Sequence, residues 1–427
     1  MEINGTTNDQ NGSCILPLPI ADEQWKLYET ISWWLEGCGS IIIGLMGIIF
    51  NLTTINVLFG SDLASSFFNW LLVCLAIFDN LFLLTGILEA FRNQIGSSSL
   101  HNQVFVMFLY PLRSVVMCCS IYMTIMLALE RYHALAKPMV SQRKGSLCRA
   151  QHTFKNYFKT HRVRVIRYVG PIIVLASLFY IPKLFELHLE KHEICEENNS
   201  TNSNETVYHC WYENQVQVAD LRKNDIYILW YLNVTNLLLT AIIPLAALAV
   251  LNFKIFRKLK EYVDRQPSAK MSEVDKRSPT APRKMQRKEK EVIQQTMVLF
   301  AIVIFFLIFH ILRIVLNIEE LSSLRSNTKA KIEGCTWLPF WTLVAVPVSH
   351  ILLQINSSIN LFIYCFCNNS FRNVLKSKLR SLVLLFEFRR KTFISYSRRQ
   401  TIQETNSFDL NVNNEGLWEN ADDGSIV

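Results

Sequence analysis

The chain has 427 residues, of which 50% are hydrophobic and 18% are charged, and its formal net charge is +8. The apolar residues fall into blocks of about 20, the length that a helix needs to cross a hydrocarbon core of ~30 Å. Seven such blocks predict an all-α membrane protein, a seven-transmembrane helix bundle. They exclude a β-barrel, whose strands would alternate apolar and polar residues. We place the spans near residues 31–58, 67–88, 104–135, 165–184, 227–251, 292–318 and 338–365.

These spans predict four parts in the chain: an N-terminal tail at residues 1–30, the bundle at 31–366, an amphipathic cytoplasmic helix at 367–386 and a disordered cytoplasmic tail at 387–427. The first part lacks the basic start and apolar stretch of a cleaved signal, so we expect the first span to act as the targeting element. The third part combines apolar and basic residues at helical spacing, which is typical of helices that lie on a membrane surface. The loop at 262–290 is charged and contains three prolines, which predicts a disordered middle.

Charge and glycosylation signals agree on the orientation. The loops after spans three and five are basic, so the positive-inside rule places both in the cytoplasm and the N-terminus outside, as in a multi-pass plasma-membrane protein. The basic residues therefore lie beside anionic membrane lipids, and we expect no nucleic-acid partner. Five Asn-X-Ser/Thr acceptors then fall outside the cell and predict a glycoprotein: Asn4, Asn11, Asn198, Asn199 and Asn204.

Four cysteines lie in segments that this topology places on the oxidising side: Cys14, Cys195, Cys210 and Cys335. They allow three pairings. We favour a disulfide bond between Cys195 and Cys210, which would close a hairpin between spans four and five.

Polar residues inside the spans are the main functional signal. Arg131 ends the third span beside Glu130, and an ionisable side chain inside a span usually marks function or a paired partner. A second set comes from spans one, two, three and seven: Asn51, Asp79, Ser120, Asn356, Ser357 and Asn360. A buried carboxylate needs donors or a cation, so Asp79 is a candidate Na⁺ or proton site. The alternative is that these side chains hydrogen-bond neighbouring helices to each other, at about 0.6 kcal/mol each.

Motifs in five spans resemble, in order and spacing, those of rhodopsin-like (class A) G-protein-coupled receptors. They are Asn51, the LAIFD segment ending at Asp79, the ERY segment Glu130, Arg131 and Tyr132, Pro244, and the NLFIY segment from Asn360 to Tyr364. Further segments resemble invertebrate FMRFamide-type neuropeptide receptors: YPLR at 110–113, YIPKLFE at 180–186, LNFKIF at 251–256, Phe309, His310 and Arg313, and NSSIN at 356–360. The resemblance implies a receptor without catalysis of its own, and no nucleophile and base pair, phosphate loop or metal motif stands out in the loops.

The chain departs from the receptor pattern at several positions. Val106, 25 residues before Arg131, stands where most of the class has the cysteine that ties span three to the second outer loop. Leu361 replaces the usual proline of span seven, and His310 stands where a tryptophan is expected. Span six also lacks its usual proline, with Leu312 at that place. These departures leave the outer disulfide and the activation geometry of spans six and seven open.

The resemblance also implies an activation switch built from Glu130, Arg131, Tyr132, Asn360, Tyr364, His310 and Pro244. Arg131 would be held at rest by Glu130 and by polar groups at the inner end of span six. Agonist binding would release span six, open a cleft for a heterotrimeric G protein and empty an allosteric Na⁺ from Asp79. No other cofactor or metal is expected. Phosphates added by receptor kinases at Thr401, Thr405 and Ser407 would recruit arrestin.

The ligand candidates lie at the outer ends of the spans: Glu89, Arg92, Arg113, Arg313, Glu319, Glu320 and Trp211. Arg113 stands where amine receptors carry an aspartate, and Gln354 where opsins carry the retinal lysine, so neither ligand class is expected. Carboxylates and aromatic walls suit a peptide that ends in Arg-Phe-amide. Glu89 or the Glu319/Glu320 pair would bind its arginine, and Arg113 and Arg313 would lie near its amide.

Several alternatives remain open. Glu89 and Arg113 could instead neutralise each other across spans two and three. The ligand could be another peptide or a lipid, although the charged outer rim disfavours a lipid. An ion or proton transporter built around Asp79 is a further alternative, which the lack of internal repeats disfavours.

Overall fold

The computed structural model describes residues 22–59, 66–94, 98–136, 154–198, 207–264, 281–332, 339–381 and parts of 383–390. Within these residues, seven helices are long and apolar enough to cross a membrane, which confirms the predicted seven spans. The spans are Glu23–Phe59, Phe67–Asn93, Ser99–Leu135, Val163–Phe185, Asp225–Glu261, Ile293–Ser322 and Phe340–Ser358.

Spans one, three and five each begin with a short helix that starts before the apolar block that predicted the span, because polar first turns escape a criterion based on apolar runs. The first span starts with α1 (Asp22–Ser32) and continues through η1 (Trp33–Gly39) and α2 (Ser40–Phe59). The third starts with α4 (Ser99–Val104), whose cap Ser98 accepts the His101 N–H, and continues through η3 (Phe105–Leu109) and α5 (Tyr110–Ala136). The fifth starts with α9 (Asp225–Tyr227), capped by Asn224, and passes through η5 (Ile228–Thr235) and η6 (Leu238–Ile242) into α10 (Ile243–Asp264).

The remaining spans differ in continuity. The second is the single helix α3 (Phe67–Gln94), and the sixth lies in one long helix, α12 (Ala281–Ile332), in keeping with the absence of a proline at Leu312. The fourth is α7 (Phe154–Phe179), extended by the 3₁₀ turn η4 (Ile181–Phe185). The seventh span, predicted at residues 338–365, consists of two helices. The chain turns at Ile359, between α13 (Phe340–Ser358) and α14 (Asn360–Cys367).

A side chain of span one contacts span seven directly before this turn. Asn51 Nδ2 donates to the Ser357 carbonyl at 2.9 Å. In a regular helix that carbonyl accepts the N–H of Leu361, four residues on. Asn51 therefore binds the last turn of α13.

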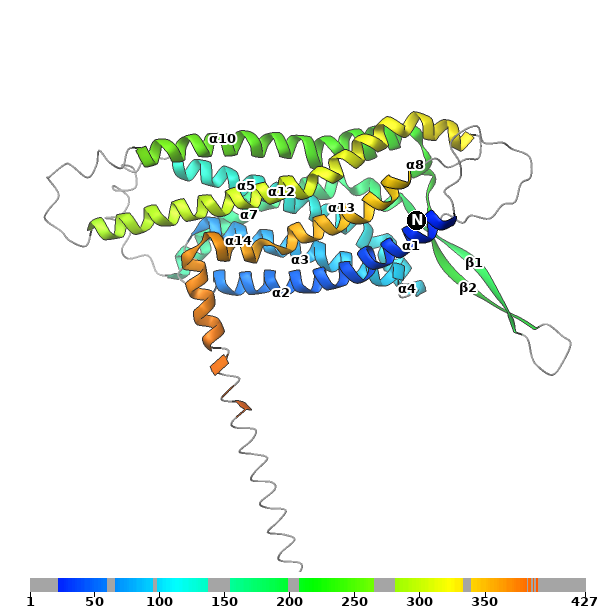
Figure 1. The fold of residues 1–427 in the computed structure, drawn as a ribbon, viewed down its shortest axis with the longest axis horizontal. Coiled ribbons are helices and arrows are strands. Elements are labelled where there is room, and N and C mark those ends of the chain that lie inside the picture. The colour runs from blue at the N-terminus through cyan, green and yellow to red at the C-terminus, as the bar shows by residue number, and fades with distance from the viewer. Residues whose placement is uncertain are drawn as a thin grey trace, which may run out of the picture. The chain divides into compact units, whose positions relative to one another are not determined.

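The outer segment between spans four and five forms an antiparallel hairpin of β1 (Leu187–Asn198) and β2 (Val207–Val218), followed by the short helix α8 (Asp220–Lys223). Figure 1 shows the hairpin projecting from the end of the bundle that carries α1, α4 and α8. Cys210 is disulfide-bonded, and the register sets Cys195 directly opposite to it. This register is compatible with the predicted pairing.

The spans close into a ring. Helix α2 packs on α3, α3 on α5, α5 on α10, α10 on α12, α12 on α13, and α13 returns to α2, while α7 lies against α5. Leucines such as Leu71, Leu83 and Leu127 are fully buried between the helices. Outward-facing apolar side chains such as Ile166 and Leu175 on α7 are exposed, as expected for a surface that meets lipid.

The chain divides into two compact units, Met1–Asn369 and Ser370–Val427. In the second unit, residues 370–381 are helical, within the range predicted for the amphipathic helix. Exposed Leu379 lies among basic residues in this helix, which suits a membrane surface. The predicted sites at Asn4, Asn11, Asn199, Asn204, Cys14, Cys335, Thr401, Thr405 and Ser407, and the middle of the 262–290 loop, lie outside the described residues.

Candidate functional site

The polar residues predicted inside the spans converge on Asp79, whose carboxylate is 1% exposed. Ser120 Oγ donates to Asp79 Oδ1 and Asn360 Nδ2 donates to Oδ2, both at 2.7 Å. Ser357 also hydrogen-bonds Asp79. Asn51 joins through the Ser357 carbonyl described above. Spans one, two, three and seven therefore meet at one carboxylate.

This polar core has the chemistry of a site for a small cation. A cavity lined in part by Ser120, Asn356 and Ser357 adjoins it. Carboxylate and hydroxyl oxygens are the ligands that hard cations prefer. No group of three or more His, Cys, Asp or Glu among the described residues could hold a metal ion. A cation here would therefore rely on Asp79 and neutral oxygens.

Arg131 is buried near the C-terminal end of α5 and reaches span six. Its Nη1 donates to Gln295 Oε1 on α12, and its guanidinium lies 4.0 Å from the centroid of the Phe68 ring. Gln295 was predicted only in general terms, as a polar group at the inner end of span six. Glu130 and Tyr132 are half-buried beside Arg131.

The other switch candidates lie along spans five to seven. Pro244 is buried near the start of α10, directly after the π-helical segment η6. Tyr364 is buried in α14. His310 is buried in α12, with Nδ1 2.9 Å from the Phe306 carbonyl and its ring stacked on Phe306 at 3.9 Å.

His310 separates two adjoining cavities. The first extends toward the polar core at Ser120. The second is lined by Met117, Ile121, Thr240, Ala241, His310, Arg313 and Ile314. The Nε of Arg313 is buried and has no hydrogen-bond partner among the described residues. The cavity has a volume of about 10 Å³, room for about one water molecule, so a ligand group that reaches Arg313 must widen it.

The outer ends of spans two and three hold a direct ion pair. Arg113 Nη1 lies 2.5 Å from Glu89 Oε2, with side chains 21% and 31% exposed. This ion pair is the contact expected if Glu89 and Arg113 neutralise each other. The Arg92 guanidinium lies 4.0 Å from the centroid of the Phe105 ring.

The remaining ligand candidates are less enclosed. Glu319 is half-buried and Glu320 is exposed on α12. Glu320 interacts electrostatically with Arg222 and Arg313 and hydrogen-bonds Asn233. The side chain of Trp211 lies outside the described residues.

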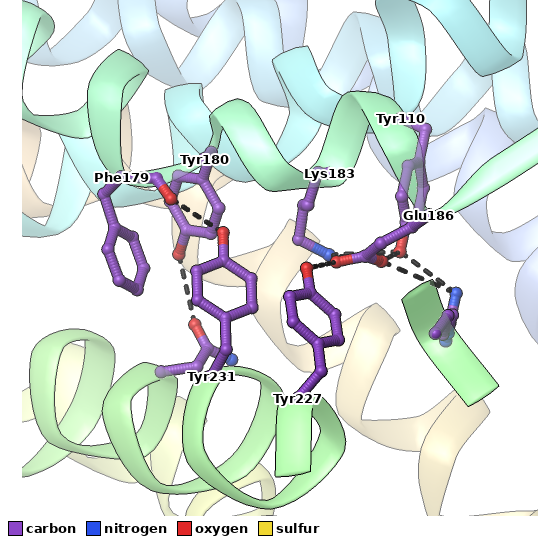
Figure 2. A network of polar contacts seen from close by, with 9 residues as sticks. Tyr110, Phe179, Tyr180, Lys183, Glu186, Tyr227 and Tyr231 are labelled. Atoms are coloured by element: carbon purple, nitrogen blue, oxygen red, sulfur yellow. Dashed lines mark hydrogen bonds and ion pairs between the residues drawn. The ribbon is translucent and has the colours of Figure 1, made fainter. Parts of the chain in front are cut away.

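Figure 2 shows a polar network that sequence reasoning did not include in the site. Glu186, directly before β1, is 0% exposed. Tyr227 OH donates to its Oε1 at 2.8 Å and Tyr110 OH donates to its Oε2. Lys183 Nζ and Arg222 Nη1 lie 3.7 and 3.8 Å from Oε2. Both Tyr110 and Glu186 belong to segments that carried the family resemblance, YPLR and YIPKLFE, so a signal was present.

The neighbouring tyrosines extend the same network. Tyr231 OH donates to the Phe179 carbonyl at 2.7 Å, and its ring stacks on Tyr227 with centroids 4.9 Å apart. Tyr180 OH donates to Asn236 Oδ1 at 3.2 Å. Spans four and five are thus joined by hydroxyl groups at their outer ends.

Comparison with known proteins agrees with this architecture. Residues 50–364 match the family described as 7 transmembrane receptor (rhodopsin family). A protein named FMRFamide receptor, from Drosophila melanogaster, is 27% identical over 353 residues, which cover 81% of this chain and 53% of the fly protein. The chain thus spans about half the length of the curated relative that it matches. Since the family match covers most of the chain and all seven spans are present, the chain belongs to the rhodopsin family of seven-transmembrane receptors.

Proposed function

We propose that this protein is a plasma-membrane receptor for a neuropeptide that ends in Arg-Phe-amide, and that it activates a heterotrimeric G protein. The observation that carries the ligand class is the cavity beside Arg313, an apolar space that ends at a guanidinium with a free Nε. We infer that this space widens on binding to take a terminal aromatic residue whose amide carbonyl accepts from Arg313. The FMRFamide receptor relative supports the same peptide class.

The peptide's arginine requires a carboxylate at a suitable distance from Arg313. Glu89 is paired with Arg113, which makes it a poor partner for a second guanidinium. Glu319 and Glu320 lie six and seven residues after Arg313 on the same helix, about 9 to 10 Å along its axis. Adjacent residues of an extended peptide are about 3.3 to 3.6 Å apart, and an arginine side chain spans the remaining distance. We therefore assign the peptide's arginine to the Glu319/Glu320 pair.

Activation would proceed as a shift between two packings of the bundle. In the resting packing, Arg131 binds Gln295 and so links the inner ends of spans three and six. A ligand in the outer cavity contacts span six near His310, and a differential affinity for the open packing would move span six away from Arg131. Na⁺ at Asp79 would favour the resting packing.

The topology proposed here places the N-terminus outside and the inner ends of α10 and α12 against the G protein. The basic helix of the second unit would lie on anionic lipid. Receptor kinases and arrestin would act on the tail at Thr401, Thr405 and Ser407. Arrestin recruitment that persists when all three are alanine would contradict this assignment.

The test is intracellular calcium and cAMP in cells that express the chain, challenged with Phe-Met-Arg-Phe-amide beside amines and long-chain lipids. A nanomolar response confined to Arg-Phe-amides is expected. A response to a lipid or an amine, with silence to these peptides, would keep the receptor family and refute the proposed ligand.

Peptide analogues locate the contacts. Replacing the peptide arginine by neutral citrulline should lower the potency of the peptide at least tenfold on the wild-type receptor. On the Glu319→Gln/Glu320→Gln variant the same replacement should change the potency little, because the receptor substitutions have already removed the ion pair. Arg313→Met should lower the potency of the amidated peptide about tenfold to 150-fold, the range expected for the loss of a hydrogen bond to a charged group. The Glu89→Gln variant provides the comparison: if it abolishes the citrulline effect instead, Glu89 binds the arginine.

A further inference from the structure

The hairpin between spans four and five is held to the helices at its base by Glu186. The Ala219 N–H, directly after β2, donates to the Glu186 carbonyl at 2.9 Å, so this residue joins both ends of the hairpin. Its carboxylate receives hydroxyl donors from span three, through Tyr110, and from span five, through Tyr227. The buried side chain of Glu186 therefore contacts the ends of spans three and five (Figure 2), while its backbone carbonyl joins the two ends of the hairpin.

The hydroxyl of Tyr110 is fully used in this arrangement. It donates its one proton to Glu186 and accepts from Lys183 Nζ at 3.1 Å and Arg222 Nη1 at 3.0 Å. A phenol offers one donor and two acceptor sites, so no capacity remains. Lys183 Nζ also lies 4.5 Å from the centroid of the Tyr110 ring. The outer end of span three is thus held by contacts that have little freedom to rearrange.

A second polar contact joins the hairpin to the start of span three. Asn102 Nδ2 donates to the Asn214 carbonyl on β2 at 2.8 Å, and Asn214 Nδ2 donates to Ser99 Oγ. The disulfide-bonded Cys210 lies within the hairpin itself, and both cysteines of span three, Cys118 and Cys119, are free. In the described part of the chain, hydrogen bonds and ion pairs take the place of a covalent link between the hairpin and span three.

We propose that Glu186 is a positioning residue for the ligand site. Its polar contacts join the hairpin to span three in place of a covalent cross-link, and span three carries the effect to the ligand site. Tyr110 lies seven and eleven residues before Met117 and Ile121 in α5, on the same face of the helix, and these two residues line the cavity beside Arg313. Fixing Tyr110 therefore fixes one wall of the proposed ligand cavity. The effect on the ligand site rests on the proposed function, whereas the cross-link itself does not.

Because Glu186 balances the charges of two cations, a second substitution that removes one cation should restore the stability lost in a Glu186 variant. Glu186→Gln leaves the cations Lys183 and Arg222 without their carboxylate, and removing one partner of a buried ion pair is strongly destabilising. Adding Lys183→Met to that variant removes one of the two cations and should restore much of the loss. Glu190→Gln is the matched control, because Glu190 lies in β1, four residues after Glu186, with a side chain that is 58% exposed.

The first measurement needs no ligand. Purified receptor is heated with a thiol-reactive dye that reports exposure of the buried Cys118 and Cys119. The midpoint should fall by roughly 5 °C or more in Glu186→Gln and recover in the double variant, while Glu190→Gln stays at the wild-type value. Tyr227→Phe, which removes one hydrogen bond and no charge, should give a smaller fall. This variant keeps the test valid if Glu186→Gln does not fold.

The second measurement is the response of cells to Phe-Met-Arg-Phe-amide, before and after treatment with a membrane-impermeant reductant. Potency should fall at least tenfold in Glu186→Gln with the maximal response retained, recover in the double variant, and be unchanged by the reductant in the wild type. An unchanged melting midpoint in Glu186→Gln, or a wild-type response that the reductant abolishes, would overturn the proposal. Silence of the wild type to the peptide, together with the expected melting shifts, would refute the proposed ligand and keep the cross-link.

Discussion

The hydrogen bond between Arg131 and Gln295 predicts how strongly the resting receptor is held closed. Gln295→Leu keeps the approximate size of the side chain and removes its carbonyl, so the Arg131 guanidinium loses this acceptor. A hydrogen bond to a charged group contributes about 1.5 to 3 kcal/mol. If the bond exists only in the resting packing, its loss shifts the equilibrium toward the open packing by about 10-fold to 150-fold.

This shift has a visible consequence in cells without ligand. For a receptor that is open about 1% of the time, a 10-fold to 150-fold shift raises the open fraction to roughly 10% to 60%. Basal G-protein activation, measured as guanine-nucleotide exchange in membranes at matched surface expression, should rise accordingly. Gln295→Glu should act in the opposite direction, because a carboxylate binds a guanidinium more strongly than an amide does.

The neighbouring residue provides the control. Gln294 is half-buried where Gln295 is buried, so Gln294→Leu makes the same chemical change one position away. It should leave basal exchange at the wild-type level. Equal basal exchange in Gln295→Leu and the wild type, with normal surface expression and a normal agonist response, would refute the reasoning.

Three further predictions concern packing and the polar core. Gly47→Ala should reduce surface expression and thermal stability, because the added Cβ would lie 2.1 Å from Ser358 Oγ, whereas Gly170→Ala meets nothing within 4 Å and should behave as wild type. Asp79→Asn should abolish any difference in agonist affinity between sodium and an organic cation in binding assays; a persistent difference would place the cation elsewhere. Asn51→Leu should lower the free energy of unfolding by about 1 kcal/mol, read as a lower melting midpoint, and an unchanged midpoint would show that its bond to the Ser357 carbonyl contributes little.

The seven spans and the polar core could be predicted because both depend on depth in the membrane. An apolar block of about 20 residues has few alternatives to a spanning helix. Within such helices, the position of Asp79 along its span also fixes its depth, so its meeting with Ser120 and Asn360 follows from their own positions. Polar groups at one depth in a bundle have only each other as partners.

Features that depend on a specific side-chain contact could not be predicted in the same way. Asn51 binds the Ser357 carbonyl directly before the turn at Ile359, and no local property of span seven indicates this contact. The network around Glu186 depends on a loop residue folding back between two spans. A glutamate directly before a strand reads as a solvated residue until its partners Tyr110 and Tyr227 are placed.

The π-helical segment η3 (Phe105–Leu109) affects how this receptor is aligned with others. A π-helical turn holds more residues than an α-helical turn. Residues N-terminal to it therefore lie at a different angle around the helix from the one expected by counting residues back from Arg131 along a regular α-helix. Arg113 lies between this segment and Arg131, so the number of residues that separates it from Arg131 still indicates its position in space. Val106 lies within the segment, so the number of residues that separates it from Arg131 does not indicate its position. The conclusion about the missing cysteine survives this displacement, because no cysteine occurs anywhere from Ser99 to Met117.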